Sequence, residues 1–217
     1  MINGYIKANQ IEKSEQLMKR MKLKNIKPNI VIYSSMIDGY IKSNQMIKAQ
    51  ELFQKMMKKK LKPNIVVYNS IIDGYIKSNQ LKESEEIFQE MISQGFKPDT
   101  ITYNIMINGY IKANQIEKSE QLMKRMKLKN IKPNIVIYSS MIDGYIKSNQ
   151  MIKAQELFQK MMKKKLKPNI VVYNSIIDGY IKSNQLKESE EIFQEMISQG
   201  FKPDTITYNI MINGYIK

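Results

Sequence analysis

The sequence predicts an all-α fold, a right-handed α-solenoid (superhelix) of stacked antiparallel helical hairpins. The first observation is an internal repeat, in which residues 1–112 recur identically as residues 106–217, a period of 105. The second is a weaker period of 35 within that block. The third is that each 35-residue segment carries two apolar stripes at helical spacing, separated by turn residues. Repeats of this length stack on their neighbours and together build one continuous core.

The period of 35 divides the chain into a single solenoid domain of five full motifs and two partial ones. The full motifs are residues 30–64, 65–99, 100–134, 135–169 and 170–204. Residues 1–29 lack the first six positions of a motif, and residues 205–217 end after position 13. Both truncations fall within expected helices, which indicates a fragment. The identical copies fit either a recent tandem duplication or an engineered repeat.

Each motif is expected to form two helices of about 12 residues, or about 18 Å at 1.5 Å per residue. In motif 30–64 the first apolar stripe has the spacing i, i+3, i+4, i+7, i+8 and consists of Tyr33, Met36, Ile37, Tyr40 and Ile41. The second stripe consists of Met46, Ala49, Phe53, Met56 and Met57. Asn44, a residue type that tolerates a left-handed turn, separates the stripes, and Pro63 ends the unit.

The composition excludes several classes of chemistry. The chain has no Cys and no His, so thiol and imidazole nucleophiles, disulfides and zinc sites of the usual Cys/His kind cannot form. Carboxylates repeat in every motif without forming a paired acid/base site, and the glycines are isolated. We therefore expect no enzyme, no catalytic residue, no metal, no cofactor and no small-molecule substrate. No apolar stretch approaches the roughly 20 residues of a membrane span, so no membrane partner is expected.

The repeated motif resembles the pentatricopeptide repeat family in its 35-residue P-type form. It begins V-x-Y-[NS]-x-x-I-[DN]-G-Y-x-K and ends Lys-Pro-[ND], in register along the whole chain. In motif 65–99 the matching residues are Val66, Tyr68, Asn69, Asp73, Gly74, Lys77, Ile87, Phe88, Met91, Gly95, Lys97, Pro98 and Asp99. The tetratricopeptide pattern, with 34 residues and a Trp, fits less well. Asn44 and Asn79 stand where the family commonly has Gly.

This resemblance implies binding of single-stranded RNA, one base per repeat, with the N-terminus of the protein toward the RNA 5′ end. Positions are counted from three residues before the Tyr. The family places two polar side chains on each base edge, at position 5 (Ser34, Asn69, Asn104, Ser139, Asn174, Asn209) and at position 35 (Asn29, Asn64, Asp99, Asn134, Asn169, Asp204). Position 2 is the base clamp (Val31, Val66, Ile101, Val136, Val171, Ile206). Position 13 lies near phosphate (Lys7, Lys42, Lys77, Lys112, Lys147, Lys182, Lys217).

The residue types suit these roles, because Asn can donate and accept hydrogen bonds, ionised Asp only accepts, and Ser does either. The β-branched residues of position 2 are stiff at χ1 and can press on a base face. The pairs Ser34/Asn64 and Ser139/Asn169 resemble the family's adenine pair, and Asn69/Asp99 and Asn174/Asp204 resemble its uracil pair. Asn104/Asn134 resembles its pyrimidine pair, with cytosine slightly ahead of uracil. The expected core target is 5′-A-U-Y-A-U-3′.

Plainer interpretations apply to other features. The net charge is +15, but motifs 30–64, 65–99 and 100–134 carry +5, −3 and +5, and most of this variation lies in second helices. Second helices usually form the outer face, so most of the charge is interpreted as solvated surface. The Tyr residues of position 4 (Tyr33, Tyr68, Tyr103) lie on the apolar stripe and are expected in the core instead of stacking on bases.

The expected biological output is steric: protecting, remodelling or presenting RNA. One alternative is a tetratricopeptide-like scaffold for protein–protein interaction, and another is an engineered repeat protein without a natural ligand. A third is self-association through the terminal motifs, whose apolar helix faces have no capping repeat. The family implies a mitochondrion or plastid, although the chain starts with no secretory signal or transit peptide.

Overall fold

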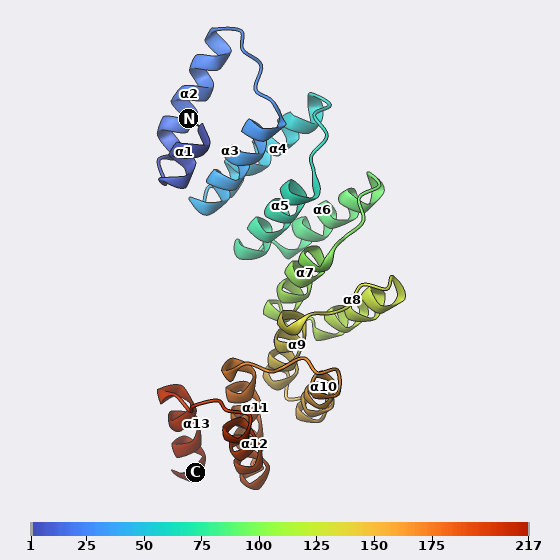
Figure 1. Cartoon of the computed structure of the whole chain (residues 1–217). Helices are drawn as coiled ribbons and strands as arrows, with labels where there is room; N and C mark the ends of the chain where they lie inside the picture. Colours follow the sequence, from blue (N-terminus) through green and yellow to red (C-terminus); the bar gives the residue numbers. More distant parts are fainter. Residues whose placement is uncertain (1, 217) are drawn as a thin grey trace. The chain divides into compact units, whose positions relative to one another are not determined.

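The computed structural model describes residues 2–216, which form helices joined by short turns and contain no strand (Figure 1). In chain order the helices are α1 (Ile2–Lys7), α2 (Ile11–Leu23), α3 (Ile30–Lys42), α4 (Met46–Lys58), α5 (Ile65–Lys77), α6 (Leu81–Ser93), α7 (Thr100–Lys112), α8 (Ile116–Leu128), α9 (Ile135–Lys147), α10 (Met151–Lys163), α11 (Ile170–Lys182), α12 (Leu186–Ser198) and α13 (Thr205–Ile216). The all-α prediction is confirmed. Within the described residues, no helix has the length and apolar character needed to cross a membrane.

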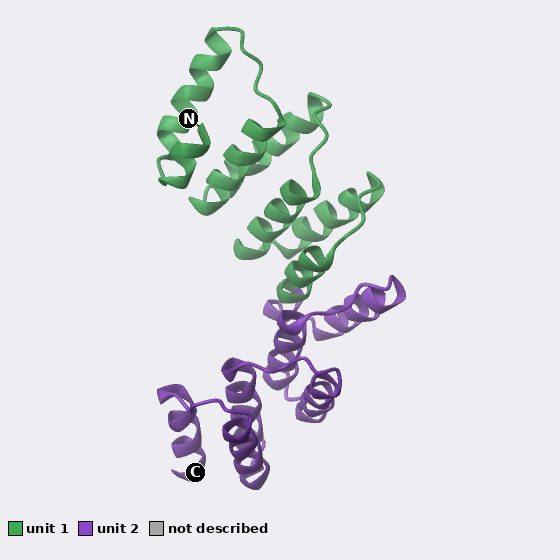
Figure 2. Cartoon of the chain, viewed as in Figure 1, with its two compact units in different colours: residues 1–109 green, residues 110–217 purple. Residues whose placement is uncertain are grey.

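The chain divides into two compact units, residues 1–109 and residues 110–217, coloured separately in Figure 2. The boundary falls inside α7, between Gly109 and Tyr110. Each unit contains helical hairpins in which a first helix of a motif is followed by a second helix. In the full motifs both helices have 13 residues, one more than the sequence predicted.

First helices of successive motifs pack directly against one another. In unit 1, α3 lies between α1 and α5, and in unit 2, α11 lies between α9 and α13. Second helices pack against the first helix of their own motif and against the first helix of the next; α4 contacts α3 and α5, and α10 contacts α9 and α11. Since no close backbone contact joins two second helices in the described part of either unit, the first helices form the tighter layer. Their exposed side chains therefore share one face.

The core lies between the two helices of a hairpin and the next motif. In the five full motifs the Tyr side chains of position 4 are completely buried, as are the Met or Ile residues three positions later, whereas Tyr208 of the last partial motif is half exposed. The ring of Tyr68 contacts Phe53 from the preceding motif at 5.6 Å and Phe96 from its own motif at 5.4 Å, measured between ring centroids. The prediction that these tyrosines belong to the core is confirmed. They are not available to stack on a ligand.

The turn between the two helices of each hairpin has an Asn in the left-handed region. Asn44 has φ 55° and Asn79 has φ 57°. Asn adopts this conformation more readily than most residues with a side chain. The replacement of the family's usual Gly is therefore compatible with the fold, as expected.

Close approach of first helices depends on the Gly of position 10. A Cβ at Gly109 would lie 2.7 Å from the Cδ1 and 2.9 Å from the Cγ1 of Ile76 in the preceding first helix. We expect Gly109→Ala to lower the free energy of unfolding by about 1–3 kcal/mol, the usual cost of overpacking. Gly4→Ala is the control, because no atom lies within 4 Å of its Cβ position and Ala favours a helix by about 1 kcal/mol. Thermal denaturation checks both; equal effects of the two substitutions would contradict this packing role.

Candidate nucleic-acid interface

Positions 2, 5 and 13 fall on one side of the first helix in every full motif; positions 2 and 13 are exposed, and position 5 is half-buried or, at Asn69 and Asn174, buried. Successive helical residues turn by about 100°, so position 13 lies within roughly 20° of position 2, and position 5 lies roughly 60° away. Because first helices pack side by side within each unit, the stripes of successive motifs become neighbours. Within each unit, the same set of side chains thus recurs from one first helix to the next.

The position 2 residues are apolar and exposed in every motif. Their exposed fractions range from 46% at Val136 to 63% at Val66. An isoleucine or valine that served the core would be buried, as the neighbouring Val67 and Val172 are. The row consists of Val31, Val66 and Ile101 in unit 1 and Val136, Val171 and Ile206 in unit 2. Each is a stiff apolar surface open to a flat ligand.

The position 35 residues cap the following first helix. The Oδ1 atoms of Asn64 and Asn169 accept hydrogen bonds from the backbone N–H groups of Val67 and Val172, both at 3.0 Å. Asn29 and Asn134 do the same at 3.1 Å. Capping leaves the Nδ2 of each Asn as the group that faces solvent, since the four residues are exposed. The sequence predicted the position of these side chains but not their role as N-caps.

The serines of position 5 use their hydroxyl protons within their own helix. Ser34 Oγ donates to the carbonyl of Ile30 at 2.7 Å, and Ser139 Oγ donates to Ile135 at 2.7 Å. Both serines are half-buried. A hydroxyl that donates one hydrogen bond still has lone pairs on its oxygen, so each serine can accept a second hydrogen bond.

The asparagines of position 5 differ, because a threonine of the next motif holds them. Thr102 Oγ1 donates to Asn69 Oδ1 at 2.8 Å and also lies 2.9 Å from Asp99 Oδ1. Unit 2 repeats this arrangement, in which Thr207 Oγ1 is 2.8 Å from Asn174 Oδ1 and 2.9 Å from Asp204 Oδ1. Positions 5 and 35 thus meet through one hydroxyl in both predicted uracil sites.

The remaining position 5 residues lack such a threonine. Asn104 has a buried Oδ1 with no hydrogen-bond partner within residues 2–216, and the next motif has Ile137 at position 3. Asn209 is exposed and belongs to the last partial motif, which has no position 35. Asn29 is the position 35 residue of the first partial motif, which has no position 5. The two end motifs therefore form incomplete base sites.

Four position 13 lysines form ion pairs that the sequence analysis did not anticipate. Lys42 Nζ lies 2.7 Å from Asp38 and Lys77 Nζ lies 2.6 Å from Asp73. In unit 2 the same pairs are Lys147–Asp143 and Lys182–Asp178. These lysines are about two-thirds exposed, and exposed ion pairs contribute only about 0–1 kcal/mol, so a phosphate can displace the carboxylate. Lys7 and Lys112 are exposed, and Lys217 lies outside the described residues.

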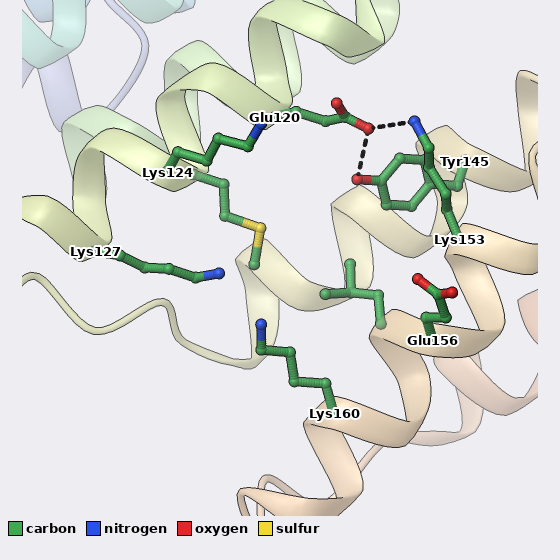
Figure 3. Close-up of a pocket in the computed structure, with 9 residues that line it drawn as sticks. Glu120, Lys124, Lys127, Tyr145, Lys153, Glu156 and Lys160 are labelled. Carbon is green, nitrogen blue, oxygen red and sulfur yellow. Dashed lines mark hydrogen bonds and ion pairs between the residues drawn. The ribbon is translucent and has the colours of Figure 1, made fainter.

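A second group of lysines lines a groove on the second helices. Figure 3 shows this groove in unit 2. There Glu120 Oε1 accepts hydrogen bonds from the Tyr145 hydroxyl at 3.0 Å and from Lys153 Nζ at 2.8 Å. Burial raises the pKa of the Glu120 carboxyl, but the bonds from Lys153 and Tyr145 outweigh it and hold that pKa below its usual value. Lys127 and Lys160 point toward one another, and the side chain of Lys160 lowers the pKa of Lys127. Tyr145, which lines this groove, is nine residues from Val136 in α9 and so lies about 180° around the helix from position 2, on the opposite side from the stripe of positions 2, 5 and 13.

Within the described residues, no group of three or more His, Cys, Asp or Glu side chains is arranged to hold a metal ion.

Comparison with known families identifies the repeats. The profile described as the PPR repeat family matches residues 63–112, 98–136, 133–171 and 168–217, and the pentatricopeptide repeat domain matches residues 2–78. The chain belongs to the pentatricopeptide repeat family. The family resemblance read from the motif is confirmed. A search of curated protein sequences found no match.

Solved pentatricopeptide repeat structures share the fold. The chain is similar to PPR10 from maize, with a TM-score of 0.80 and 24% identity over 99% of this chain and 30% of that one. PPR10 in complex with an 18-nucleotide psaJ RNA element has a TM-score of 0.79 and 24% identity, over 97% of this chain and 31% of that one. The PPR domain of Arabidopsis thaliana protein-only RNase P 1, in complex with tRNA, has a TM-score of 0.75 and 15% identity, over 87% of this chain and 99% of that one. The chain thus spans about a third of the length of PPR10, and the solenoid fold prediction is confirmed.

Proposed function

We propose that this protein binds single-stranded RNA sequence-specifically, one base per motif, with 5′-A-U-Y-A-U-3′ as its core target. The observation that carries the proposal is the repeated first-helix face. Each full motif combines an exposed apolar β-branched residue, a polar pair at positions 5 and 35, and an exposed lysine. PPR10, a structural relative, has been solved with a bound RNA element. Apolar contact with base faces and hydrogen bonds to base edges are how proteins read unpaired RNA.

The hydrogen-bonding polarity of the polar pairs supports the base assignment. In the Ser34/Asn64 pair, position 5 offers an acceptor and position 35 offers the Asn64 amide donor. Adenine presents the complement, an N6 amino donor beside the N1 acceptor. In the Asn69/Asp99 pair the polarity is reversed, because Asn69 offers its Nδ2 donor and Asp99 only accepts. Uracil, with a carbonyl acceptor beside N3–H, complements that arrangement.

The consequence of binding is steric in this proposal. Bound RNA is shielded from nucleases, kept from refolding, or presented to another factor, and the repeats themselves catalyse no reaction. An organellar role, in mitochondria or plastids, follows from family membership alone.

The test is a titration of fluorescent 5′-A-U-C-A-U-3′, flanked by unstructured spacers, against the same RNA with both adenines changed to guanine. Each mismatched base edge costs about 1–3 kcal/mol, so the guanine RNA is expected to bind at least about tenfold more weakly. Equal affinity for the two RNAs would overturn the base assignment. Absence of binding to either RNA would overturn RNA binding itself.

A further inference from the structure

We infer that Thr102 and Thr207, at position 3, are specificity-positioning residues that orient the position 5 amide and so set the choice of uracil over cytosine. This inference rests on the proposed RNA-binding function. It concerns residues that would not touch the base themselves, because both threonine side chains are completely buried. They would act through Asn69 and Asn174.

The amide of Asn69 has two orientations with opposite hydrogen-bonding character. One turns the Oδ1 acceptor toward the ligand, and the other turns the Nδ2 donor toward it. Thr102 Oγ1 donates to Asn69 Oδ1 at 2.8 Å, and it shares this proton with Asp99 Oδ1 at 2.9 Å. Asn69 is only 8% exposed, and a buried carbonyl oxygen without a partner costs about 1–3 kcal/mol. The threonine therefore favours the orientation with Nδ2 toward the base.

Asp99 keeps the threonine in place. Asp99 Oδ1 accepts the backbone N–H of Thr102 at 2.9 Å, and the backbone N–H of Asp99 donates to Thr102 Oγ1 at 3.3 Å. This reciprocal pair is a helix N-cap in which the threonine hydroxyl is doubly held. In unit 2 the backbone and side-chain hydrogen bonds from Thr207 lower the pKa of the Asp204 carboxyl, because they stabilise its ionised form.

The other motifs lack this hydroxyl. Position 3 is threonine only in the motifs that follow an Asn/Asp pair; elsewhere it is Ile32, Val67, Ile137 or Val172. The buried Oδ1 of Asn104 has no partner among residues 2–216. No threonine hydroxyl therefore sets the orientation of the Asn104 amide, which fits the expectation that motif 100–134 accepts either pyrimidine.

Uracil and cytosine are the informative pair of bases, because they have the same ring size and opposite hydrogen-bonding character at the C4 substituent and at N3. A donor on Asn69 and an acceptor on Asp99 complement uracil. A reversed amide would remove that preference without changing the space available. The effect of Thr102 should therefore appear in the ratio of affinities for the two bases, while a helix cap alone would affect stability.

The experiment compares Thr102→Val with Thr102→Ser and the unchanged chain, and uses the second uracil site as an internal control. Four RNAs carry U or C at the second and fifth bases of 5′-A-U-C-A-U-3′. For Thr102→Val we expect the preference for U over C at the second base to fall at least about fivefold. The preference at the fifth base, read by the unchanged Asn174/Thr207/Asp204 set, should persist. Thr102→Ser should restore the second-base preference, because it keeps the hydroxyl.

Outcomes separate this inference from the proposed function. If the unchanged chain prefers U over C and Thr102→Val keeps the same ratio, the inference is overturned and the proposed function stands. If the unchanged chain does not distinguish U from C at either base, the uracil assignment of the proposed function is overturned, and the inference that rests on it is overturned as well. A loss of stability in Thr102→Val is measured separately by thermal denaturation. A gain-of-function arm covers that case: in a Ser34→Asn, Asn64→Asp chain, adding Val67→Thr should increase the preference for U at the first base, and no increase would count against the inference.

Discussion

The double variant Asn64→Asp, Asn169→Asp is expected to change both adenine sites into guanine sites. In the proposed complex Asn64 offers its amide donor to the base, because its Oδ1 caps α5. A carboxylate offers only acceptors, which repel the N1 lone pair of adenine and complement the N1–H of guanine, and the Ser34 hydroxyl can turn its proton from the Ile30 carbonyl to the guanine O6. At about 1–3 kcal/mol per site, the affinity for 5′-A-U-C-A-U-3′ should fall about 100-fold over the two sites. The affinity for 5′-G-U-C-G-U-3′ should rise, as measured by fluorescence anisotropy.

The fold should tolerate this change, because Asp caps a helix as well as Asn does and its charge is favourable at a helix N-terminus. Asp99 and Asp204 already occupy the equivalent positions. The matched control is Asn25→Asp, Asn130→Asp, which introduces the same charge at exposed turn residues after the second helices. The control should weaken both RNAs equally. Unchanged base preference in the Asn64/Asn169 variant would contradict the assigned role of position 35.

The second large effect is expected from removing the lysine row of position 13. Replacing Lys42, Lys77, Lys112, Lys147 and Lys182 by Gln removes one exposed ammonium from each full motif. On single strands each phosphate contact contributes about −0.7 to the slope of log affinity against log salt concentration. If each of the five lysines neutralises one phosphate, the unchanged chain should therefore show a slope of about −3.5. The variant should show a slope close to zero and bind about 1,000-fold more weakly at about 0.1 M salt.

The control removes the same charge from the second helices. It replaces Lys19, Lys22, Lys55, Lys127 and Lys160, which line the grooves of the kind shown in Figure 3. These lysines lie away from the position 2 row, so only long-range attraction should change. The control should keep a slope near that of the unchanged chain. An equal loss of slope in both variants would assign RNA contact to the outer groove as much as to the first helices.

Most of the fold could be predicted from the sequence because the signal repeats. The tyrosine of position 4 recurs at a helical spacing with Met36 and Ile37, and all three are completely buried in the structure. Pro63 and the Asn44 turn mark where helices stop, and α4 lies between them. A periodic pattern read several times in register leaves little ambiguity about helix boundaries.

The candidate site could be predicted by position but not by side-chain state. The family resemblance assigns Ser34 and Asn64 to one base, which stays a prediction, and only the structure shows that the Ser34 hydroxyl donates to Ile30 and that Asn64 caps α5. These states depend on rotamers, which residue type alone does not define. Two features had a readable signal that was missed. Asp38 and Lys42 are four residues apart, the spacing of a helical ion pair, and threonine at position 3 follows only the Asn/Asp pairs.

The central claim is that successive motifs read successive bases of one RNA strand, and selection from a random RNA pool tests it most directly. The purified chain is incubated with a pool of unstructured RNAs, and bound molecules are sequenced after several rounds. The account predicts enrichment of adenine, uracil, a pyrimidine, adenine and uracil in that order from the 5′ end. Enrichment of no sequence, or of a sequence unrelated to that order, would contradict it.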